Sequence, residues 1–297
     1  MSTDGLQPPQ IRFEDGVPVA ARYDDVYFSR AGGLAETRGI FVEQNRLIER
    51  WSAASSGRAF TIGELGFGTG LNFCATVAAF RARVADDAGP RRLRYFSCEA
   101  HPLHRDQLRQ ALEPYRPELA EEIAALLAVY PPAVAGIHAL RLTLPPASAG
   151  YTIELILLLG TAQTTFAALD SPANPERGIN AFYLDGFAPA RNPEMWSAEL
   201  FAELRRLAAP GATFATYTAA GAVRRALGDV GFAVEKIPGF GHKREMLRGQ
   251  LNESKSDSQP EHSTRAAVHS KRIVVIGAGL AGTAAAGVAG GSGSALW

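Results

Sequence analysis

The chain has 297 residues, of which 46% are hydrophobic and 20% charged, values typical of a globular protein that buries a sizeable core. Lys and Arg total 30 and balance 30 Asp and Glu, which excludes a protein that is basic over its whole surface; any nucleic acid must be held by a local patch. Only two cysteines, Cys74 and Cys98, are present, so no disulfide framework or metal site is predicted and both are expected to be buried thiols.

The first ten residues are polar and lack the apolar segment of a signal peptide. No run of about 18 apolar residues occurs, so no membrane span is expected. We therefore predict a cytoplasmic protein.

Residues 1–58 are predicted to be an N-terminal extension that packs on the core, with ordered loops at 23–29 and 33–37 and helical spacing over 41–51. From residue 59 to 250, apolar β-prone runs alternate with helical patterns. The predicted strands are 59–65, 93–99, 140–144, 151–159, 181–185, 212–218, 231–237 and 244–248. The predicted helices are 70–83, 102–113, 116–130, 163–169, 193–208 and 219–229. This alternation predicts an α/β fold, a doubly wound and mostly parallel sheet whose ligands bind at the carboxyl ends of the strands.

The most informative motif follows the first of these strands, where Glu64 precedes three glycines, Gly66, Gly68 and Gly70, at alternate positions. Glycines let the backbone turn sharply and approach a nucleotide closely. The spacing E-x-G-x-G-x-G differs from the pyrophosphate-binding G-x-G-x-x-G, and a carboxylate repels phosphate but suits a cation or a ribose hydroxyl. The motif therefore favours S-adenosylmethionine (SAM) over NAD. A loop that only connects a strand to a helix is the alternative, and three glycines beside an acid argue against it.

Glu99 ends the second strand of this unit. An acid at this position of a doubly wound sheet typically accepts hydrogen bonds from ribose hydroxyls. We favour this role over that of a surface acid at a strand end.

The second strong feature is Asp185, which an apolar strand delivers to the same edge ahead of a loop that contains Phe187, Pro189 and Pro193. An aspartate there can accept a hydrogen bond from an amine and take its proton during methyl transfer. Phe187 and Trp196 are candidates for stacking a base. The alternative is an Asp-Gly turn before a helix that begins at Pro193; this helix start is also expected and is compatible with the first role.

A short basic loop contains Lys243 and Arg244, and Arg224 and Arg225 are nearby in the sequence. Together they predict a local patch that contacts phosphates near the acceptor. A solvated surface loop is an equally good explanation of these charges.

The C-terminal part differs in composition. Residues 251–270 are polar and Ser-rich, which predicts a linker, and 271–297 contain a strand pattern followed by G-x-G-x-x-G. Only 15 residues follow Gly282, whereas a complete βαβ unit takes about 30 residues or more. This segment is therefore predicted to be the truncated start of a dinucleotide-binding, FAD-type domain that does not bind a dinucleotide by itself.

With these residues in view, the chain resembles the methyltransferase half of the bacterial tRNA 5-methylaminomethyl-2-thiouridine biosynthesis bifunctional proteins. The stretches that carry the resemblance are 23–29, 33–37, 64–73, 99–102, 183–196 and 239–247. The family joins a class I SAM-dependent methyltransferase, with a Rossmann-like seven-stranded sheet, to an FAD-dependent oxidase. The resemblance implies methylation of the aminomethyl group on carbon 5 of the wobble uridine in the tRNA anticodon loop.

The resemblance also implies roles for individual residues, with Asp185 as the catalytic group. The expected cofactor-binding residues are Glu64, Gly66, Gly68, Gly70, Asn72, Glu99, Thr161 and Ala162. The expected substrate-binding residues are Phe187, Pro189, Trp196, Lys243 and Arg244.

Two departures from the family pattern affect these expectations. The family has Gly-Asp-Ala where this chain has Gly160-Thr161-Ala162, and loss of the acid is expected to weaken SAM binding by about 1–3 kcal/mol if an adenine amine is left unpaired. The oxidase half is missing, so neither FAD nor redox activity is expected here. An oxidase domain or a separate oxidase chain would be a partner.

Three other functions remain open at this point. The first is a SAM-dependent methyltransferase whose acceptor is a small-molecule or protein amine. The second is a catalytically weak tRNA-binding domain, and the third is an NAD- or FAD-dependent oxidoreductase. The last requires a functional motif in 271–297, and flavin absorbance would reveal it.

Overall fold

A computed structural model describes residues 6, 9–14, 17–28, 32–55, 57–84, 90–146, 150–241 and 243–252. Residues 253–270 of the predicted linker, the motif in 271–297 and His242 lie outside these ranges. Leu251, the first residue of the predicted linker, belongs to the last strand instead. The described residues belong to one compact unit, Met1–Asn252, which includes the N-terminal segment and the core. None of its described helices combines the length and the apolar character that crossing a bilayer requires.

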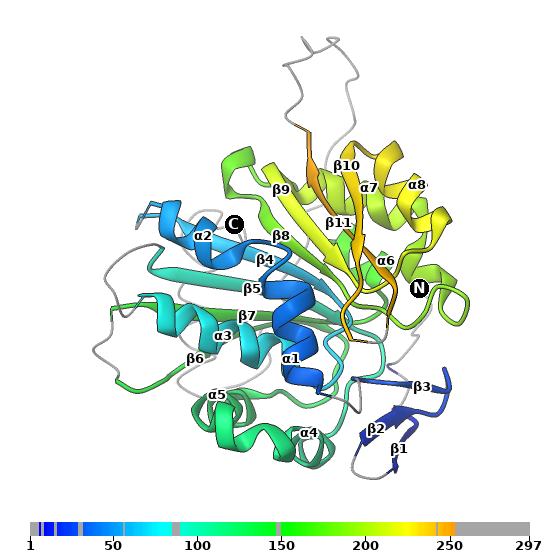
Figure 1. Ribbon diagram of the computed structural model, residues 1–297. Coiled ribbons are helices and arrows are strands. Elements are labelled where there is room, and N and C mark those ends of the chain that lie inside the picture. The colour runs from blue at the N-terminus through cyan, green and yellow to red at the C-terminus, as the bar shows by residue number, and fades with distance from the viewer. Residues whose placement is uncertain are drawn as a thin grey trace, which may run out of the picture. The chain divides into compact units, whose positions relative to one another are not determined.

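The described part of the core is built on an eight-stranded sheet with the order β10-β11-β9-β8-β4-β5-β7-β6 (Figure 1). Its strands are β4 (Ala59–Leu65), β5 (Arg92–Glu99), β6 (Gly136–Leu142), β7 (Thr152–Leu159), β8 (Ile179–Leu184), β9 (Ala208–Thr216), β10 (Phe232–Pro238) and β11 (Glu245–Leu251). The five central strands are parallel, whereas β6, β10 and β11 are joined by antiparallel pairing. The sheet has one strand more than the expected seven, because β6 pairs with β7 as the predicted hairpin.

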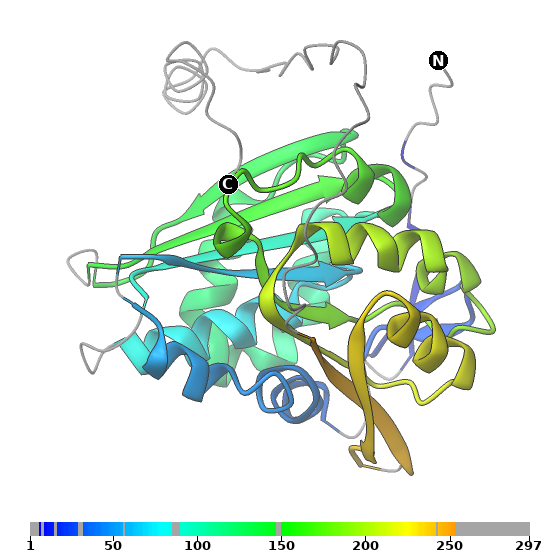
Figure 2. The ribbon, with the colours of Figure 1, turned by 90° about the horizontal axis from the view of Figure 1, so that it is seen from above.

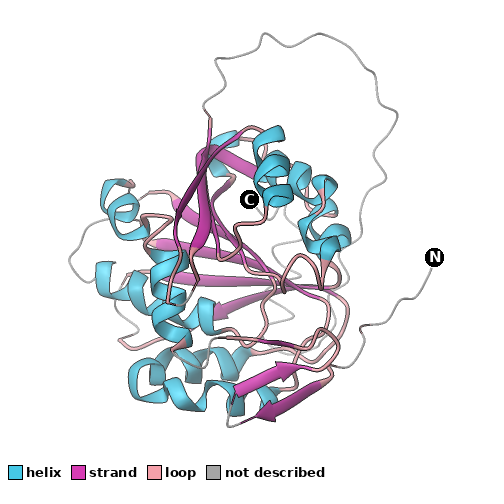
Figure 3. Ribbon diagram, turned by 45° about the vertical axis from the view of Figure 1, so that its right-hand side comes forward, coloured by secondary structure: helices cyan, strands magenta, loops and turns pink. Residues whose placement is uncertain are grey.

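Helices cover both faces of the sheet, as the alternating pattern predicted (Figures 2 and 3). One group consists of α1 (Gly33–Thr37), α2 (Leu47–Ala53), α3 (Leu71–Val84), α4 (Arg105–Leu112) and α5 (Arg116–Val129), which contact one another around α3 and α5. The other group consists of α6 (Ala162–Ala167), α7 (Ala198–Leu207) and α8 (Gly221–Asp229). Short 3-10 turns lie at η2 (Glu113–Tyr115), η3 (Pro175–Arg177) and η4 (Pro193–Trp196).

The single helix predicted over 193–208 is divided in two. Ser197 has an extended backbone, and its hydroxyl accepts a hydrogen bond from the Leu200 N–H, so it caps α7 and separates it from η4. The buried residues of α7 (Leu200, Phe201, Leu204 and Leu207) recur at helical spacing on one face.

The N-terminal segment is more regular than the predicted loops. It forms a small antiparallel sheet of β1 (Ile11–Glu14), β2 (Val17–Ala20) and β3 (Asp25–Val26), and 33–37 is helical rather than a loop. The expected helix over 41–51 is interrupted, since a π-helical turn, η1 (Arg38–Val42), is followed by Arg46 at φ 52° before α2 begins. Phe41 stacks on Tyr183 of β8 and Trp51 packs edge-on against Phe80 of α3, so these N-terminal elements share the core of the sheet.

The register of the parallel strands brings the predicted site residues to one edge. Leu65 of β4 lies opposite Cys98 of β5 and Leu184 of β8, and Glu99 lies opposite Leu159 of β7. Gly66 and Asp185, which follow β4 and β8, therefore start at the level of Glu99, and Gly160, which follows β7, starts one residue beyond it. This edge is the carboxyl end of the parallel sheet, where ligands of such folds bind.

Candidate active site

A cavity of about 800 Å³ opens at this carboxyl edge, a volume in the range of small-molecule binding sites. Its wall is formed by the loop after β4, the end of β5, the start of α6, the loop after β8 and the N-terminal segment. Of the predicted site residues, nine line it: Gly66, Gly68, Asn72, Glu99, Thr161, Ala162, Asp185, Phe187 and Lys243. Five that the structure also describes do not: Glu64, Gly70, Pro189, Trp196 and Arg244.

The glycine loop is shaped by backbone conformations that favour glycine, with φ values of 89° at Gly66 and 73° at Gly70. A Cβ at Gly66 would lie 2.8 Å from the backbone carbonyl oxygen of Asp185, so a side chain there would push two strand ends apart. At Gly70 a Cβ would meet Leu126 and Phe67 at 2.9 Å. The absence of a side chain at Gly66 thus lets the glycine loop lie against the end of β8. At Gly70 it lets Phe67 and Leu126 pack beneath the loop.

Glu99 is held at the cavity wall by backbone donors. One carboxylate oxygen accepts from the Gly68 N–H at 2.8 Å and the other from the His101 N–H at 2.7 Å. Each carboxylate oxygen has a second lone pair, so a ribose diol in the cavity would find two fixed acceptors. This position fits the ribose-binding role predicted for Glu99.

Glu64 lies behind the wall and not on it, which corrects the expectation that its carboxylate meets a ligand directly. Glu64 lies opposite Ser97 of β5 in the sheet. Its fully buried carboxylate accepts a hydrogen bond from the Ser97 hydroxyl at 2.6 Å and another from the Asn72 side-chain amide at 2.9 Å. Burial raises the pKa of Glu64 to about 8, against the lowering effect of these two donors. Glu64 therefore acts on the cavity only through Asn72.

Asn72 bridges the two carboxyl groups. Its amide nitrogen donates to Glu64 at 2.9 Å and to Asp185 at 2.6 Å, while its amide oxygen accepts from the Thr37 hydroxyl at 2.7 Å. Both amide N–H groups are thus used, and the Thr37 bond is consistent with this orientation of the amide. Thr37 was missed by the sequence reasoning, because nothing local connects it to a helix 35 residues away.

Asp185 is half-buried and lines the cavity. Withdrawal from water raises its pKa to about 7; the charges of Glu36 and Asp25 act in the same direction, and Asn72 and Lys243 act against them. A carboxylate with a pKa near neutrality is suited to accept a proton at physiological pH. The carboxyl group predicted to serve as the base therefore lines the cavity with a raised pKa, and its role in catalysis stays a prediction.

We expect Glu64→Gln to raise the thermal stability of the protein by several degrees at pH 9 and to change it little at pH 5. An acid whose folded-state pKa is raised contributes stability at low pH that is lost as pH rises through about 8, and glutamine removes this loss. Thermal unfolding at the two pH values measures the difference, with the exposed Glu199→Gln as the control. An equal shift at both pH values would contradict the assigned pKa.

Thr161, the departure from the family pattern, is an exposed residue at the start of α6. Its hydroxyl accepts from the Thr164 N–H at 3.3 Å and lies 2.8 Å from the Thr164 hydroxyl, so it caps the helix. Capping is a role that aspartate fills equally well. Thr161 therefore preserves the local backbone at the cavity wall while it lacks the negative charge.

The acceptor loop after β8 presents Phe187 but not Trp196. Tyr23 stacks on Phe187 with ring centroids 4.5 Å apart, and Tyr27 meets it edge-on. The Trp196 side chain is buried, and its indole N–H donates to the Phe187 carbonyl at 2.9 Å. Trp196 therefore supports the loop from behind, which corrects its prediction as a surface for stacking a base.

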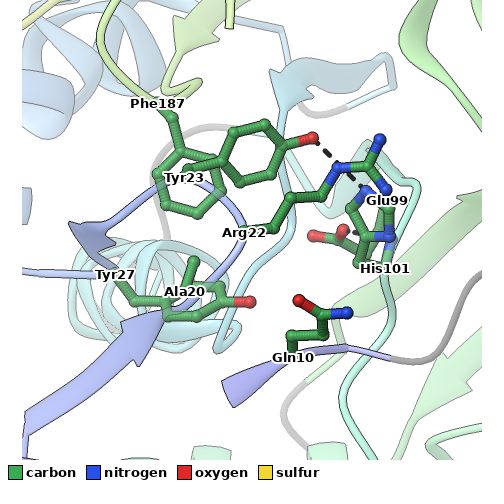
Figure 4. A pocket seen from close by; sticks show the side chains of 8 residues that line it. All are labelled: Gln10, Ala20, Arg22, Tyr23, Tyr27, Glu99, His101 and Phe187. Atoms are coloured by element: carbon green, nitrogen blue, oxygen red, sulfur yellow. Dashed lines mark hydrogen bonds between the residues drawn. The ribbon is translucent and has the colours of Figure 1, made fainter. Parts of the chain in front are cut away.

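The corner between β2 and β3 ties the two sides of the site together. The Tyr23 hydroxyl lies 3.3 Å from His101 Nε2, next to Glu99, and a smaller pocket of about 210 Å³ lies beside this contact (Figure 4). On the acceptor side, Arg191 donates to the Tyr23 carbonyl at 2.7 Å and the Ala188 N–H donates to Asp25 at 3.3 Å. The aromatic content of residues 23–28 was the only sequence signal for this role.

The predicted basic patch is only partly at the cavity. Lys243 lines the wall, and its ammonium lies 3.7 Å from the centroid of the Tyr217 ring. Arg244 is exposed and lies off the wall, and Arg224 and Arg225 are exposed on α8. Among the residues that the structure describes, no cluster of His, Cys, Asp and Glu is suited to a metal ion.

Comparisons with known proteins identify relatives of this chain by sequence and by fold. The sequence model of a family described as "S-adenosyl-L-methionine-dependent methyltransferase" matches residues 117–252. The chain is 43% identical over 289 residues to the "tRNA 5-methylaminomethyl-2-thiouridine biosynthesis bifunctional protein MnmC" of Chromohalobacter salexigens, covering 95% of this chain and 39% of that protein. The protein of the same name from Pseudomonas aeruginosa is 46% identical over 275 residues, covering 92% and 40%. The chain thus spans about two fifths of the length of these relatives.

Among solved structures, the chain is similar to MNMC2 from Aquifex aeolicus, with a TM-score of 0.56 and 19% identity. The match covers 86% of this chain and 73% of that chain. This likeness concerns the fold, and with the family match it confirms the predicted α/β class I methyltransferase architecture.

Proposed function

We propose that this chain methylates the aminomethyl group of 5-aminomethyl-2-thiouridine at the wobble position of tRNA. The proposal is supported by the match of residues 117–252 to the SAM-dependent methyltransferase family and by the identity of 43% and 46% to one portion of two bifunctional MnmC proteins. The observation that carries the proposal is the position of Asp185, a carboxyl group that lines the cavity and whose pKa is raised to about 7. It lies at the same sheet level as the glycine loop and Glu99.

The residues present fit SAM. The glycine loop lets a ligand approach the backbone, Glu99 offers acceptors to a ribose diol, and Thr161 and Ala162 form the wall where the family contacts adenine. SAM supplies a methyl group that its sulfonium already activates. The protein's contribution is therefore mainly to position the acceptor and to manage its proton.

Asp185 would receive that proton. An aminomethyl group enters as an ammonium, and it must lose one proton to expose the nitrogen lone pair. The ionised Asp185 would take this proton. Bound SAM would supply the methyl group, with the nitrogen–carbon bond forming as the sulfur–carbon bond breaks and S-adenosylhomocysteine as the leaving product. Asn72 holds Asp185 by its 2.6 Å hydrogen bond throughout and keeps the carboxylate directed at the cavity.

A base in an anticodon loop is a suitable acceptor, because it can be splayed out of the stack and bound against aromatic side chains. Phe187 and Tyr27 provide aromatic surface at the wall, although Tyr23 occupies one face of Phe187. Lys243 and Arg244 would accompany the tRNA backbone. The proposed place of action is the cytoplasm, and an oxidase domain or a separate oxidase chain would prepare the amine.

The test measures SAM binding by calorimetry, followed by transfer of labelled methyl to three acceptors: bulk tRNA that lacks the modification, fully modified tRNA, and small primary amines. We expect label only in the first. Label in small amines alone would favour a small-molecule methyltransferase, and SAM binding without any transfer would favour a tRNA-binding domain. Absence of SAM binding would contradict the cofactor assignment.

Thr161→Asp is expected to tighten SAM binding by about five- to a hundredfold, which corresponds to the 1–3 kcal/mol of a satisfied polar contact. The aspartate would cap α6 as threonine does and add an acceptor at the wall. Calorimetric titration with SAM measures the change. Thr161→Asn, which can cap α6 without a negative charge, is the matched control and is expected to tighten SAM binding less. Equal affinity in Thr161→Asp and the wild type would show that Thr161 does not face the adenine.

A further inference from the structure

Lys243 and Tyr217 meet at the cavity wall for a topological reason. Tyr217 follows β9, and Lys243 precedes β11, which pairs antiparallel with β9 and sets Leu247 opposite Thr216. The start of β11 therefore lies beside the end of β9. The Lys243 ammonium lies 3.7 Å from the centroid of the Tyr217 ring, a distance typical of a direct cation–π contact.

The Tyr217 ring is held firmly in this position. Its hydroxyl donates to the Gly186 carbonyl at 2.5 Å, and Trp196 packs edge-on against the ring at 6.2 Å. Tyr183 of β8 lies opposite Ala215 of β9, so Tyr217 follows its strand at the level where Asp185 follows β8. A fixed aromatic face thus lies next to the proposed base.

The surrounding charges favour a cation at this face. Asp25, Glu36 and Asp185 line the same cavity, and their charges favour the protonated form of Lys243. Among the described residues, Lys243 nevertheless has no salt bridge, and its ammonium rests on the ring instead. Partial withdrawal of the ammonium from water lowers the pKa of Lys243, although the residue as a whole is exposed.

We propose that the face of Tyr217 is the docking site for the protonated amine of the acceptor, and that Lys243 occupies this site until the acceptor arrives. This inference rests on the proposed function, because a primary ammonium on a flexible methylene is what Lys243 and a 5-aminomethyl group share. An amine docked there lies beside Asp185, to which it passes one proton.

The test titrates the protein, saturated with S-adenosylhomocysteine, with the nucleoside 5-aminomethyluridine, using 5-hydroxymethyluridine as the uncharged probe. Lys243→Met removes the occupant and is expected to tighten binding of the amine about three- to tenfold. Tyr217→Leu is expected to weaken it by about five- to thirtyfold relative to Tyr217→Phe, because only leucine removes the aromatic face. Neither change should alter affinity for the uncharged probe.

Weaker amine binding in Lys243→Met would overturn the proposal, because it would make Lys243 a ligand rather than an occupant. Equal affinities in Tyr217→Leu and Tyr217→Phe would overturn it as well. Titration with S-adenosylhomocysteine shows whether each variant retains the folded cofactor site. The two proposals fail separately: a protein that binds the nucleoside in this pattern but methylates no tRNA has the docking site without the proposed activity, and a protein that methylates tRNA without this pattern has the activity without the docking site.

Discussion

Replacing Asp185 by asparagine is expected to lower the rate constant of methyl transfer by about 10²- to 10⁴-fold, the range that a positioned general base contributes. Asparagine has the same shape and still accepts the 2.6 Å hydrogen bond from Asn72, so the loop and the cavity should persist. It cannot take a proton from an ammonium. SAM affinity, measured by calorimetry, should therefore remain close to that of the wild type.

The pH dependence gives this prediction a second readout. Because Asp185 acts in its ionised form and its pKa is raised to about 7, the wild-type rate should increase with pH and level off above about 7. This inflection should be absent from the residual activity of Asp185→Asn. The exposed Asp229→Asn, at the end of α8, is the control and should match the wild type. A rate within tenfold of the wild type for Asp185→Asn would contradict the role of Asp185 as the base.

The second large effect is expected from Gly66→Ala, which should weaken SAM binding at least tenfold. The backbone at Gly66 has φ 89°, a conformation that costs an alanine about 1–3 kcal/mol, and the new Cβ would lie 2.8 Å from the Asp185 carbonyl oxygen. The loop must move away from β8 to relieve this contact. This movement would displace the backbone of the glycine loop, which the bound SAM is expected to approach. It would also displace Asp185, the proposed base.

Gly228→Ala is the matched control for this substitution. Gly228 lies exposed in α8, and a Cβ there meets nothing within 4 Å, so alanine should leave SAM binding unchanged and stabilise the helix by about 0.5–1 kcal/mol. Thermal unfolding of both variants separates a loss of stability from a loss of affinity. Wild-type SAM affinity in Gly66→Ala would contradict the proposed approach of the cofactor to this loop.

The elements of the fold were largely predictable because their signals are local. Apolar runs of strand length, the three alternating glycines and the Pro145–Gly150 break each act over a few neighbouring residues. The convergence of Glu99 and Asp185 was predictable as well, since the carboxyl ends of parallel strands share one edge. The division of 193–208 was missed, because the capping hydroxyl of Ser197 competes with a continuous helical pattern.

The inner architecture of the site was not predictable in this way. The direction of the Glu64 carboxylate depends on its pairing with Ser97, and the orientation of Asn72 depends on Thr37, which lies on a different element. The contacts of Tyr23 with Phe187 and of Lys243 with Tyr217 likewise join distant segments. Such contacts are set by tertiary packing, so a single sequence carries no periodic or local trace of them.

The proposed reaction is tested most directly by nucleoside analysis, using mass spectrometry, of undermodified tRNA that has been incubated with the protein and SAM carrying a deuterated methyl group. We predict that 5-aminomethyl-2-thiouridine is converted into 5-methylaminomethyl-2-thiouridine carrying the deuterated methyl, and that Asp185→Asn produces almost none. Deuterated methyl on a different nucleoside, or none in tRNA while the protein is saturated with SAM, would contradict this prediction.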